Sequence, residues 1–491
     1  MNKKLKLFII TLGVLLVVCI LVYRFSNVAP DKNLTPDEQM MEIFSSGGCI
    51  MCHIRMDSSY TVLYDSNSAP VLSDTITSIV GSFPFYYNLP IVKDIMDKDI
   101  NDGLRHSDLS RFYYFGLTGN CKKDIDEVNL AKIEKVVMDE TMPPFKYYVF
   151  HWGASLNNEE KNIVLNWVKE RRAKYYATNL ASKEFANEPI QPLPTYENIN
   201  YHKAVLGNIL YNDTRLSKDN TISCASCHNL STGGVDNKQY SEGYKKQLGG
   251  INAPTVFNAV YNFVQFWDGR AADLVEQAGG PPLNPVEMAS KDWDEIIAKY
   301  SNDLTLLQSF NLIYPDGITG LNICDAIAEY EKTLTTPNSK FDKYLKGNKA
   351  ILSKDEKEGY ELFKKHECAT CHVGKNIGGQ SFEFTGLKNN YFTDRKNNKK
   401  IEVNENDYGR YNFTKNELDR YKFKVPTLRN IALTYPYWHD GTMKKLDEPV
   451  IAMLKYQCDK TLPERDIKKI ISFLNTLTGE FDGHLLSNSN K

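Results

Sequence analysis

The longest apolar stretch of the chain lies near its N-terminus, at residues 7–23 (LFIITLGVLLVVCILVY), just after Lys3, Lys4 and Lys6. This length is at the short end of a membrane span and exceeds most signal-peptide cores. Lysines on one flank place that flank in the cytoplasm. Because no small-residue cleavage site follows, the pattern predicts an uncleaved anchor at residues 1–25, with a cleaved signal peptide as the alternative. We therefore expect a single-pass protein of a bacterial inner membrane, with the rest of the chain in the periplasm.

Helical periodicity dominates the remainder of the chain. Apolar residues recur three and four positions apart in residues 158–177, 355–366 and 463–477, and a shorter apolar run covers residues 204–211. Pro463 suits the first turn of the last of these helices. Runs with strand-like alternation are sparse, so the sequence predicts a mainly α fold rather than an α/β sheet.

Two polar stretches that contain proline divide the chain. Residues 26–36 (SNVAPDKNLTP) are typical of a tether, and residues 187–195 (NEPIQPLPT) are typical of a linker. A chain of 491 residues has room for about three domains of ~150 residues each. We therefore expect domains at residues 26–186, 187–346 and 347–491, after the anchor.

Most of the cysteines fall in one repeated motif. Cys-x-x-Cys-His pentapeptides occupy residues 49–53, 224–228 and 368–372 and contain six of the ten cysteines. The other four follow no disulfide spacing and are interpreted as small buried hydrophobic residues, with a disulfide at Cys121 as the weaker alternative. These four are Cys19, Cys121, Cys324 and Cys458.

Each pentapeptide is the attachment motif of a c-type haem, in which two thiols bond the porphyrin and the adjacent histidine reaches the iron. The expected attachment cysteines are Cys49, Cys52, Cys224, Cys227, Cys368 and Cys371, and the expected proximal ligands are His53, His228 and His372. Zinc needs cysteine pairs that converge on one ion, which three separated motifs fit poorly. The sequence therefore predicts three covalently bound haem c groups in three cytochrome c-like domains in series after a transmembrane helix. A net charge of −2 gives no basic surface for nucleic acid.

The sixth iron ligand of the first haem is expected from a methionine in a proline-rich loop. Met142 is followed by Pro143 and Pro144, which keep the loop out of helix and hold the thioether outward. A thioether ligand raises the haem potential. His151, beside Trp152, is the competing ligand, and simple packing in the core is the alternative role for Met142.

From about residue 196 to residue 480 the chain resembles the bacterial dihaem cytochrome c peroxidases. The matching segments, in order, are residues 224–236 (CASCHNLSTGGVD), 251–259 (INAPTVFNA), 265–272 (QFWDGRAA), 284–288 (NPVEM), 334–344 (LTTPNSKFDKY) and 423–441 (FKVPTLRNIALTYPYWHDG). The resemblance implies an enzyme that reduces hydrogen peroxide to water at the His228 haem.

The first domain resembles a separate haem-binding domain whose pattern ends in Met-Pro-Pro, Tyr and His-Trp, here Met142, Tyr148 and His151-Trp152. Together with the anchor, this looks like the trihaem membrane-bound relatives, among them the quinol peroxidases. The resemblance implies that electrons enter at the His53 haem. The quinone pool is the expected donor, because the anchor holds this haem near the membrane, and a small cytochrome c is the alternative. The resemblance leaves a homodimer open.

Several roles follow from the resemblance alone. Met453 matches the sixth ligand of the electron-transferring His372 haem, with Met443 as a nearer but less well placed competitor. Trp267 matches the tryptophan between the two haems of the core. A calcium ion is implied at Asn252, Thr434 and Pro436, because amide and carbonyl oxygens suit that hard ion. The alternative, purely structural roles are a core aromatic for Trp267 and a turn for Pro436.

Glu276 matches the glutamate above the peroxide-reducing haem. Cleavage of peroxide needs a base that takes one proton and returns it to the leaving oxygen. A carboxylate whose neutral form is favoured by burial can do this. Asp273 is the competitor, although a helix surface suits it better. Gln265 is expected to orient the peroxide, and Arg270 is expected to pair with haem propionates.

Tyr244 marks a departure from the family pattern. It lies sixteen residues after His228, where the family often has an inhibitory histidine ligand. A neutral phenol binds iron poorly, so we expect this haem to react with peroxide without prior reduction. A pure electron-transfer cytochrome and a protein-modifying oxidase that resembles the methylamine dehydrogenase maturase are the alternative functions.

Overall fold

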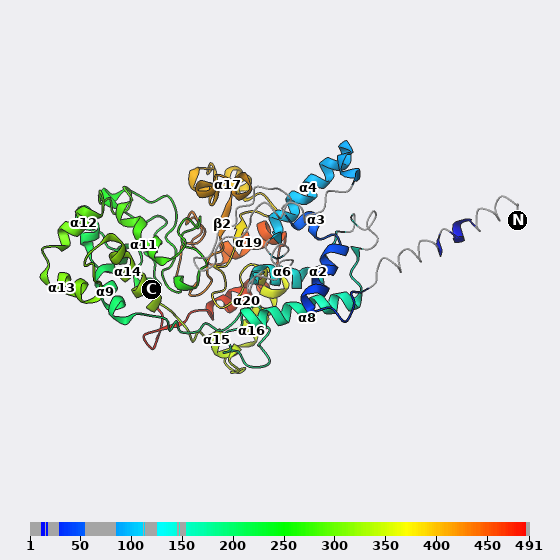
Figure 1. Cartoon of the computed structure of the whole chain (residues 1–491), viewed down its shortest axis with the longest axis horizontal. Coiled ribbons are helices and arrows are strands. Elements are labelled where there is room, and N and C mark those ends of the chain that lie inside the picture. The colour runs from blue at the N-terminus through cyan, green and yellow to red at the C-terminus, as the bar shows by residue number, and fades with distance from the viewer. Residues whose placement is uncertain are drawn as a thin grey trace. The chain divides into compact units, whose positions relative to one another are not determined.

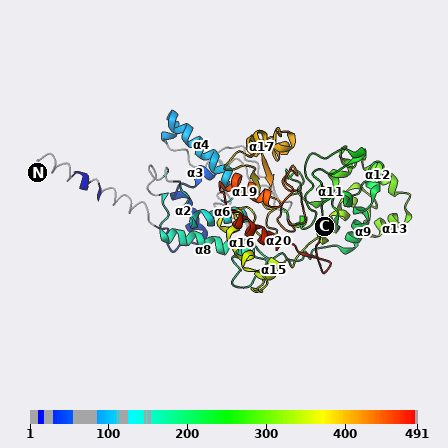
Figure 2. The ribbon, with the colours of Figure 1, turned by 180° about the vertical axis from the view of Figure 1, so that it is seen from behind.

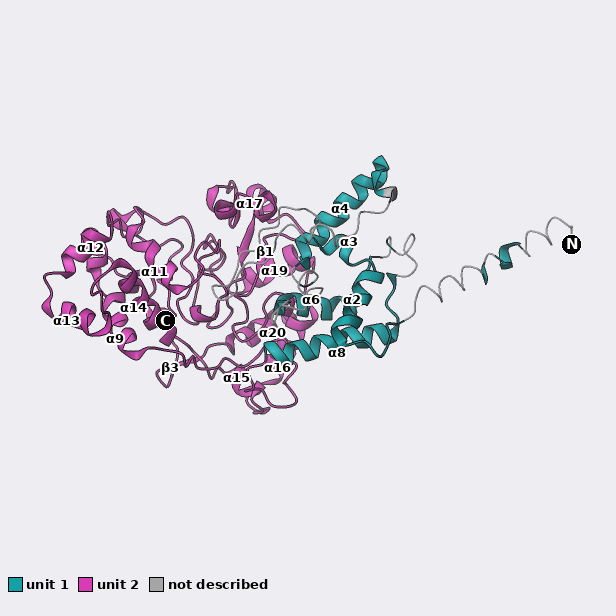
Figure 3. Ribbon diagram, in the orientation of Figure 1, with its two compact units in different colours: residues 1–176 teal, residues 177–491 magenta. Residues whose placement is uncertain are grey.

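The computed structural model describes residues 11–14, 16–17, 29–54, 85–110, 112, 125–144, 147 and 154–487. The chain divides into two compact units, Met1–Tyr176 and Ala177–Lys491, shown in teal and magenta in Figure 3. Helices provide most of the regular structure that is described in both units, and the four short strands of the described part all lie in unit 2 (Figure 1). The prediction of a mainly α fold is confirmed.

Unit 1 consists of helices and one 3₁₀ turn in the part that the structure describes. In chain order these elements are α2 (Pro36–Ser46), α3 (Ile50–His53), η2 (Phe85–Asn88), α4 (Pro90–His106), α6 (Glu127–Met138) and α8 (Asn158–Tyr175). Thr35 and Asn157 begin α2 and α8 with capping boxes, which satisfy amides that a helix N-terminus leaves open. Helix α8 confirms the helix predicted from periodicity at residues 158–177.

Trp167 of α8 lies at the centre of the core of unit 1 and is 1% exposed. Its ring centroid lies 5.1 Å from that of Phe112, which meets Phe44 of α2 at 5.6 Å. The indole Nε1 donates a hydrogen bond to Asp37 Oδ1 over 2.7 Å, so the polar atom of this large side chain is satisfied. These contacts fix α2, the helix that leads into the first pentapeptide.

Unit 2 holds the other two pentapeptides. Its α-helices are α9 (Tyr201–Tyr211), α10 (Cys224–Cys227), α11 (Leu274–Leu283), α12 (Trp293–Tyr300), α13 (Leu304–Ile313), α14 (Gly320–Thr333), α15 (Lys340–Leu345), α16 (Lys354–Lys365), α17 (Tyr391–Lys399), α18 (Tyr411–Thr414), α19 (Asp447–Cys458) and α20 (Glu464–Asn475). Its 3₁₀ turns are η4 (Thr214–Leu216), η5 (Leu230–Thr232), η6 (Tyr244–Lys246), η7 (Ala259–Tyr261), η8 (Cys368–Thr370), η9 (Glu405–Tyr408) and η10 (Glu417–Asp419). Two antiparallel pairs join β1 (Phe382–Phe384) to β2 (Lys422–Lys424) and β3 (Glu480–Phe481) to β4 (His484–Leu485).

Two closely packed helix pairs support the pentapeptides of unit 2. Gly207 brings α9 against α14, since a Cβ there would lie 1.8 Å from the carbonyl oxygen of Ala326. Gly359 does the same for α16 and α20, where a Cβ would lie 2.0 Å from the carbonyl oxygen of Lys469. Helices α16 and α20 lie side by side in both Figure 1 and Figure 2. The helices predicted near residues 204–211, 355–366 and 463–477 are thus confirmed.

The proline-rich segment predicted as a linker is packed into unit 2. Ile190 and Leu193 are fully buried. The amide of Gly374 donates to the carbonyl of Pro189 over 2.8 Å, and the amide of Gln191 donates to the carbonyl of Gly374 over 3.4 Å. Prolines keep the segment extended, and an extended chain with alternating apolar residues can pack like an added strand.

The predicted anchor is corrected by the structure. Within the described residues, no helix is both long and apolar enough to cross a membrane. Of the apolar run at residues 7–23, only residues 11–14 and 16–17 are described, and they are helical. The run satisfied a length rule for membrane spans, but the structure does not bear out an assignment to the inner membrane.

Candidate functional site

The three pentapeptides adopt the same local structure. In each, the histidine amide donates a hydrogen bond to the carbonyl of the first cysteine, four residues earlier. The N–O distances are 3.1 Å for His53 to Cys49, 3.0 Å for His228 to Cys224 and 3.0 Å for His372 to Cys368. This single helical turn brings the first thiol and the imidazole to the same face of the backbone.

The motif imidazoles are half-buried and are held in the form that suits an iron ligand. The Nδ1 atom of His53 lies 2.8 Å from the carbonyl of Ser107, and that of His372 lies 3.3 Å from the carbonyl of Ile377. An Nδ1–H that donates to a carbonyl leaves the lone pair on Nε2, the arrangement usual in metal-bound histidine. Burial lowers the pKa of His53 and His228, and it lowers the pKa of His372 to about 4. Neutral imidazoles are therefore favoured.

The motif thiols also fit covalent haem attachment. Cys49, Cys224, Cys227 and Cys368 form no disulfide. Burial raises the pKa of Cys49 to about 11 and raises those of Cys224 and Cys368 further. In the described parts of the chain, no group of three His, Cys, Asp or Glu side chains is placed to hold a metal ion. A pair of thiols and a neutral imidazole on one turn fits haem c, whose porphyrin supplies four iron ligands itself.

The expected sixth ligand of the first centre lies in an open loop. Met142 is 37% exposed and follows α6, beside Pro143 and Pro144. Its competitor His151, together with Tyr148 and Trp152, lies outside the described residues. The structure therefore shows that Met142 is not used to fill the core of unit 1, the bland alternative for this residue.

Met453 lies on α19 beside an aromatic cluster in unit 2. The buried residues of this cluster are Tyr391, Phe392, Phe423, Tyr437, Trp438, Met443 and Ala452, and Met453 and Trp267 pack against it. The competitor Met443 is 5% exposed and is fixed by a bridge to Tyr437, whose amide donates to the Met443 carbonyl over 2.7 Å. Met453 is partly buried on a helix face and is less constrained, which favours it over Met443 as a ligand.

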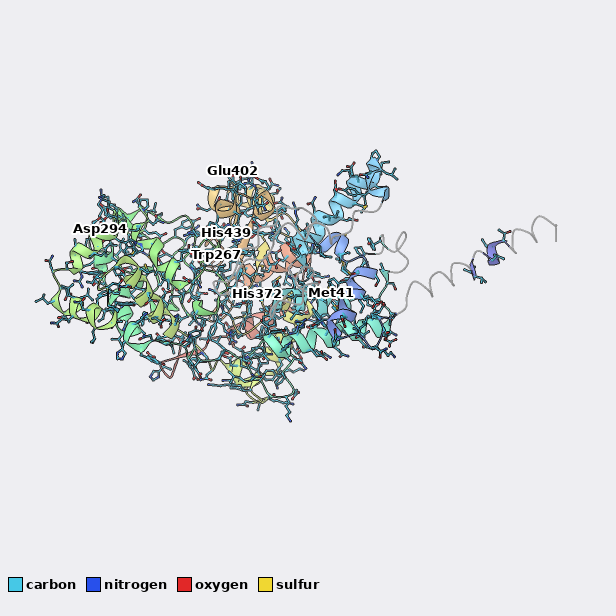
Figure 4. All side chains as sticks on the ribbon, in the orientation of Figure 1. Met41, Trp267, Asp294, His372, Glu402 and His439 are labelled. Carbon is cyan, nitrogen blue, oxygen red and sulfur yellow. The ribbon has the colours of Figure 1, made fainter. Side chains whose placement is uncertain are left out.

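Trp267 is held at both its side chain and its backbone. Its Nε1 donates to the carbonyl of Asn252 over 2.9 Å, and its own carbonyl accepts from the amide of Lys424 over 2.7 Å. Its ring meets Phe423 edge to face at 6.2 Å, and Phe423 stacks on His439 at 4.4 Å. Trp267 and His439 are labelled in Figure 4. Trp267 is thus part of a continuous aromatic stack rather than an isolated core residue.

A buried ionic network is joined to this stack through His439. His439 Nε2 lies 2.8 Å from Asp407 Oδ1, and Arg395 donates to Asp407 and, over 2.9 Å, to Asp440. Burial alone would raise the pKa of Asp407, but hydrogen bonds from His439 and Arg395 hold it well below its usual value. Sequence reasoning missed this network, because the residues that bond to one another are 12 to 45 positions apart and form no motif.

The three residues proposed for calcium lie in two loops that meet in unit 2. The side-chain amide of Asn252 donates to the carbonyls of Lys238 (3.0 Å) and Gln239 (3.3 Å), which leaves its oxygen as an acceptor. The backbone amide of Asn252 donates to the carbonyl of His439 over 2.8 Å. Thr434 and Pro436 lie in the loop that leads to His439 and can offer backbone carbonyls.

Glu276 is exposed, so the burial that we expected for a catalytic base is not observed. It occupies the first turn of α11, where its Oε2 accepts from the amide of Ala272 over 2.7 Å. Asp273 caps the same helix by accepting from the amide of Glu276 over 2.9 Å. The interpretation of Asp273 as a residue of the helix surface fits this cap.

Gln265 and Arg270 have local partners in the structure. Gln265 is 6% exposed, and its Nε2 donates to the carbonyl of Ala259 over 3.0 Å. This bond holds the loop and favours a positioning role over contact with peroxide. Arg270 pairs with Asp268 at 3.0 Å and stacks on Phe266 at 3.6 Å.

Tyr244 begins the η6 turn and is partly buried. Its amide donates to the carbonyl of Glu287 over 2.7 Å, which fixes the turn beside α11. The ammonium groups of Lys245 and Lys218 lie 5.3 Å and 5.8 Å from the centre of its ring.

Comparison with known proteins places this site in a family. Residues 201–350 match the di-haem cytochrome c peroxidase family, and residues 78–170 match the haem-binding domain family. Cytochrome c peroxidase Ccp of Escherichia coli is 48% identical over 405 residues, which cover 82% of this chain and 85% of the relative. The cytochrome c551 peroxidase of Nitrosomonas europaea is 48% identical over 297 residues, which cover 60% of this chain and 85% of the relative.

A solved structure supports the fold. A MauG-like protein associated with microbial copper homeostasis aligns with a TM-score of 0.52 and 26% identity, over 62% of this chain and 98% of that protein. The architecture is therefore that of a mainly helical, MauG-like dihaem peroxidase. The chain belongs to the di-haem cytochrome c peroxidase family and also carries a haem-binding domain. The prediction of a peroxidase, an oxidoreductase that acts on peroxide, is confirmed.

Proposed function

We propose that this protein is a trihaem peroxidase that reduces hydrogen peroxide to water, with one haem c at each pentapeptide. The observation that carries the proposal is the shared turn in which His53, His228 and His372 each bond back to the first cysteine of their motif. Three motifs that share this backbone hydrogen bond support three attachments of the same kind. The domains proposed to hold the haems are residues 26–186, 187–346 and 347–491.

Haem c supplies one-electron redox chemistry and an iron at which peroxide can bind. The thiols of each motif hold the porphyrin, and the imidazoles of His53, His228 and His372 hold the iron. Met142 and Met453 are the proposed sixth ligands in the first and third domains. The His228 centre is the proposed site of peroxide reduction, because no methionine is assigned to it.

The proposed proton carrier at that site is Glu276. Its carboxylate would take one proton of hydrogen peroxide and return it to the leaving oxygen, which departs as water when the O–O bond breaks. Two electrons from the donor and two protons from solvent then convert the other oxygen to a second water. Glu276 lies in the first turn of α11, and its Oε2 accepts a hydrogen bond from the amide of Ala272. Gln265 fixes the loop that precedes α11 and so positions Glu276.

The remaining residues are proposed to connect and stabilise the two centres of unit 2. Trp267 lies in the aromatic stack beside Met453 and provides a path for electrons between the His372 and His228 centres. A calcium ion at Asn252, Thr434 and Pro436 would hold the loop on which the Trp267 indole is anchored. The ion is therefore expected to keep this path in place.

A small reduced cytochrome c is the proposed electron donor, with the His53 centre as the entry point. A relative named as a cytochrome c551 peroxidase supports such a donor. Quinol is the competing donor, implied by the first domain. Steady-state peroxide reduction with each donor decides between them, and light scattering tests the proposed homodimer.

The haem count is tested on the whole protein. Intact-mass measurement and pyridine haemochrome spectra should give three haems per chain. The double variant Cys49→Ser/Cys52→Ser should hold two and lose turnover with cytochrome c, while artificial donors still work. The control Cys324→Ser/Cys458→Ser should keep three. Two haems in the wild type, or unchanged cytochrome c turnover in the first variant, would contradict the proposal.

A further inference from the structure

Lys424, the last residue of β2, is a buried cation without a visible counter-charge. Its residue is 6% exposed. In the described part of the chain, no carboxylate pairs with its ammonium, and burial lowers its pKa to about 8. Buried lysines are rare unless they are paired, because a charge removed from water needs a partner.

The other buried cations of unit 2 do have partners. Arg429 donates to Asp342 over 2.7 Å, and Arg395 donates to Asp407 and Asp440. Lys422, two residues earlier on the same strand, reaches Asp419 at 3.4 Å. Among the described residues, Lys424 therefore differs from Lys422 on its own strand and from the buried arginines of unit 2, because it has no carboxylate partner.

The strand places Lys424 between two elements of the site. Its backbone amide donates to the carbonyl of Trp267 over 2.7 Å. Two residues further on, the backbone carbonyl of Pro426 lies close enough to the His372 imidazole to raise its pKa. This opposes the larger fall in pKa that burial causes. Residues 423–426 thus run from the Trp267 stack to the third pentapeptide.

The side chain of Lys424 lies on the face of β2 opposite to Phe423, since neighbouring strand residues alternate. Phe423 belongs to the aromatic stack with Trp267. Lys424 pairs in register with Phe382 of β1 and shares its face. The side chain of Lys424 thus leaves β2 on the face opposite to the aromatic stack.

We propose that Lys424 binds a propionate carboxylate of the haem attached at Cys368 and Cys371. The inference rests on the proposed function, because it requires a haem at His372. A haem propionate is an anion that enters the fold with the cofactor, and it supplies the charge that the chain does not. Arg270, which the sequence suggested for such a role, is exposed and already paired with Asp268.

The pairing would raise the reduction potential of the His372 haem as well as help to hold the haem in place. A cation beside a propionate offsets its negative charge, and this favours the reduced iron. Lys424 is therefore a positioning residue that keeps the potential of the His372 centre high enough to accept electrons. It does not touch peroxide.

The experiment is a redox titration of the holoprotein carrying Lys424→Met, which keeps the length of the side chain and removes the charge. One of the three midpoint potentials should fall, and it should be the one that also moves in Met453→His. Lys424→Arg should restore it toward the wild-type value. Lys422→Met is the matched control on the same strand and should leave all three potentials in place.

Two results would overturn the pairing: unchanged potentials in a fully loaded Lys424→Met protein, or an equal shift of all three. If that variant does not accumulate, Lys424→Gln takes its place under the same criteria. The haem count of the wild type is measured in parallel. If the wild type lacks a third haem, the proposed function itself is contradicted. If the wild type holds three haems but Lys424→Met changes no midpoint potential, only the pairing is contradicted.

Discussion

The indole Nε1 of Trp267 donates a hydrogen bond to the backbone carbonyl of Asn252 over 2.9 Å. The residue proposed to connect two haems is therefore in direct contact with a residue proposed to bind calcium. Asn252 is fixed from its other side by its own amide, which donates to the carbonyl of His439 over 2.8 Å. A change in the calcium loop should consequently move the indole.

We predict that Trp267→Phe weakens calcium binding as well as electron transfer. The ring is retained, but the Nε1–H that anchors Asn252 is lost. A net hydrogen bond contributes about 1 kcal/mol, so calcium affinity should fall roughly two- to tenfold. Calorimetric titration with calcium and stopped-flow reoxidation by peroxide measure the two effects.

Trp438→Phe is the matched control, because the Nε1 of Trp438 is buried and lacks a hydrogen-bond partner among the described residues. Trp438 belongs to the same aromatic cluster. This variant should keep the calcium affinity of the wild type. Equal losses in both variants would mean that the cluster acts only through packing.

The second prediction concerns the buried pair of Asp407 and Arg395, whose side chains are each 1% exposed. Asp407→Asn leaves the guanidinium of Arg395 with less than its full counter-charge. Breaking a buried pair by removing one partner typically costs about 3–5 kcal/mol. The free energy of unfolding, from chemical denaturation, should fall by about this amount.

Asp394→Asn is the control for that experiment. Asp394 forms a surface pair with Lys455 at 2.6 Å, and exposed pairs of this kind contribute little. Unfolding of the control should match that of the wild type. If the two variants behaved alike, the Asp407 network would be shown to be as well solvated as a surface pair.

Much of the fold follows from local patterns in the sequence. Helix α8 carries a 3.6-residue period and an Asn157 cap, so its start and end can be predicted from the residues that form it. The same holds for α16 and α20, although Pro463 caps α20 rather than lying in its first turn. The segment at residues 187–195 could not be placed this way, because its burial depends on Gly374, far along the chain.

The third prediction is a pH dependence of stability set by Glu331. This residue of α14 is 5% exposed, and burial raises its pKa to about 8. The folded state therefore holds its proton more tightly than the unfolded state, in which the pKa is near the ordinary glutamate value of 4.5. Between these two values, stability should fall as pH rises, by up to about 1.4 kcal/mol per pH unit.

Glu331→Gln cannot ionise, so it should flatten this part of the stability profile and stabilise the protein most near pH 8. Urea midpoints at about pH 5, 6.5 and 8 measure the slope. Glu329→Gln, two residues earlier on α14, is the control, since Glu329 pairs with Lys332 at 2.5 Å. An unchanged slope in Glu331→Gln would show that another group sets the dependence.

The sequence predicted some residues of the candidate site and gave no signal for others, for a physical reason. The proposed attachment cysteines and proximal histidines belong to a five-residue motif, and the same backbone hydrogen bond closes a turn in all three copies. Lys424 and the Asp407–His439 pair gave no sequence signal, because burial of a charge depends on segments that meet only in the folded chain. The exposure of Glu276 likewise depends on how α11 packs, which its own residues do not specify.

The last prediction separates Met453 from Met443 as the sixth ligand of the His372 centre. Both are near the same aromatic cluster, but Met443 is fixed by its bridge to Tyr437, whereas Met453 lies on a face of α19. Met453→His should keep all haems attached and lower one midpoint potential, because a thioether favours ferrous iron more than an imidazole does. Turnover with cytochrome c should fall, since the centre then accepts electrons less readily. Met443→Leu should leave all three potentials unchanged and reduce stability only slightly, as a swap of similar volume does. If Met443→Leu moved a potential and Met453→His did not, the two methionines would exchange roles, and the loop before α19 would hold the ligand.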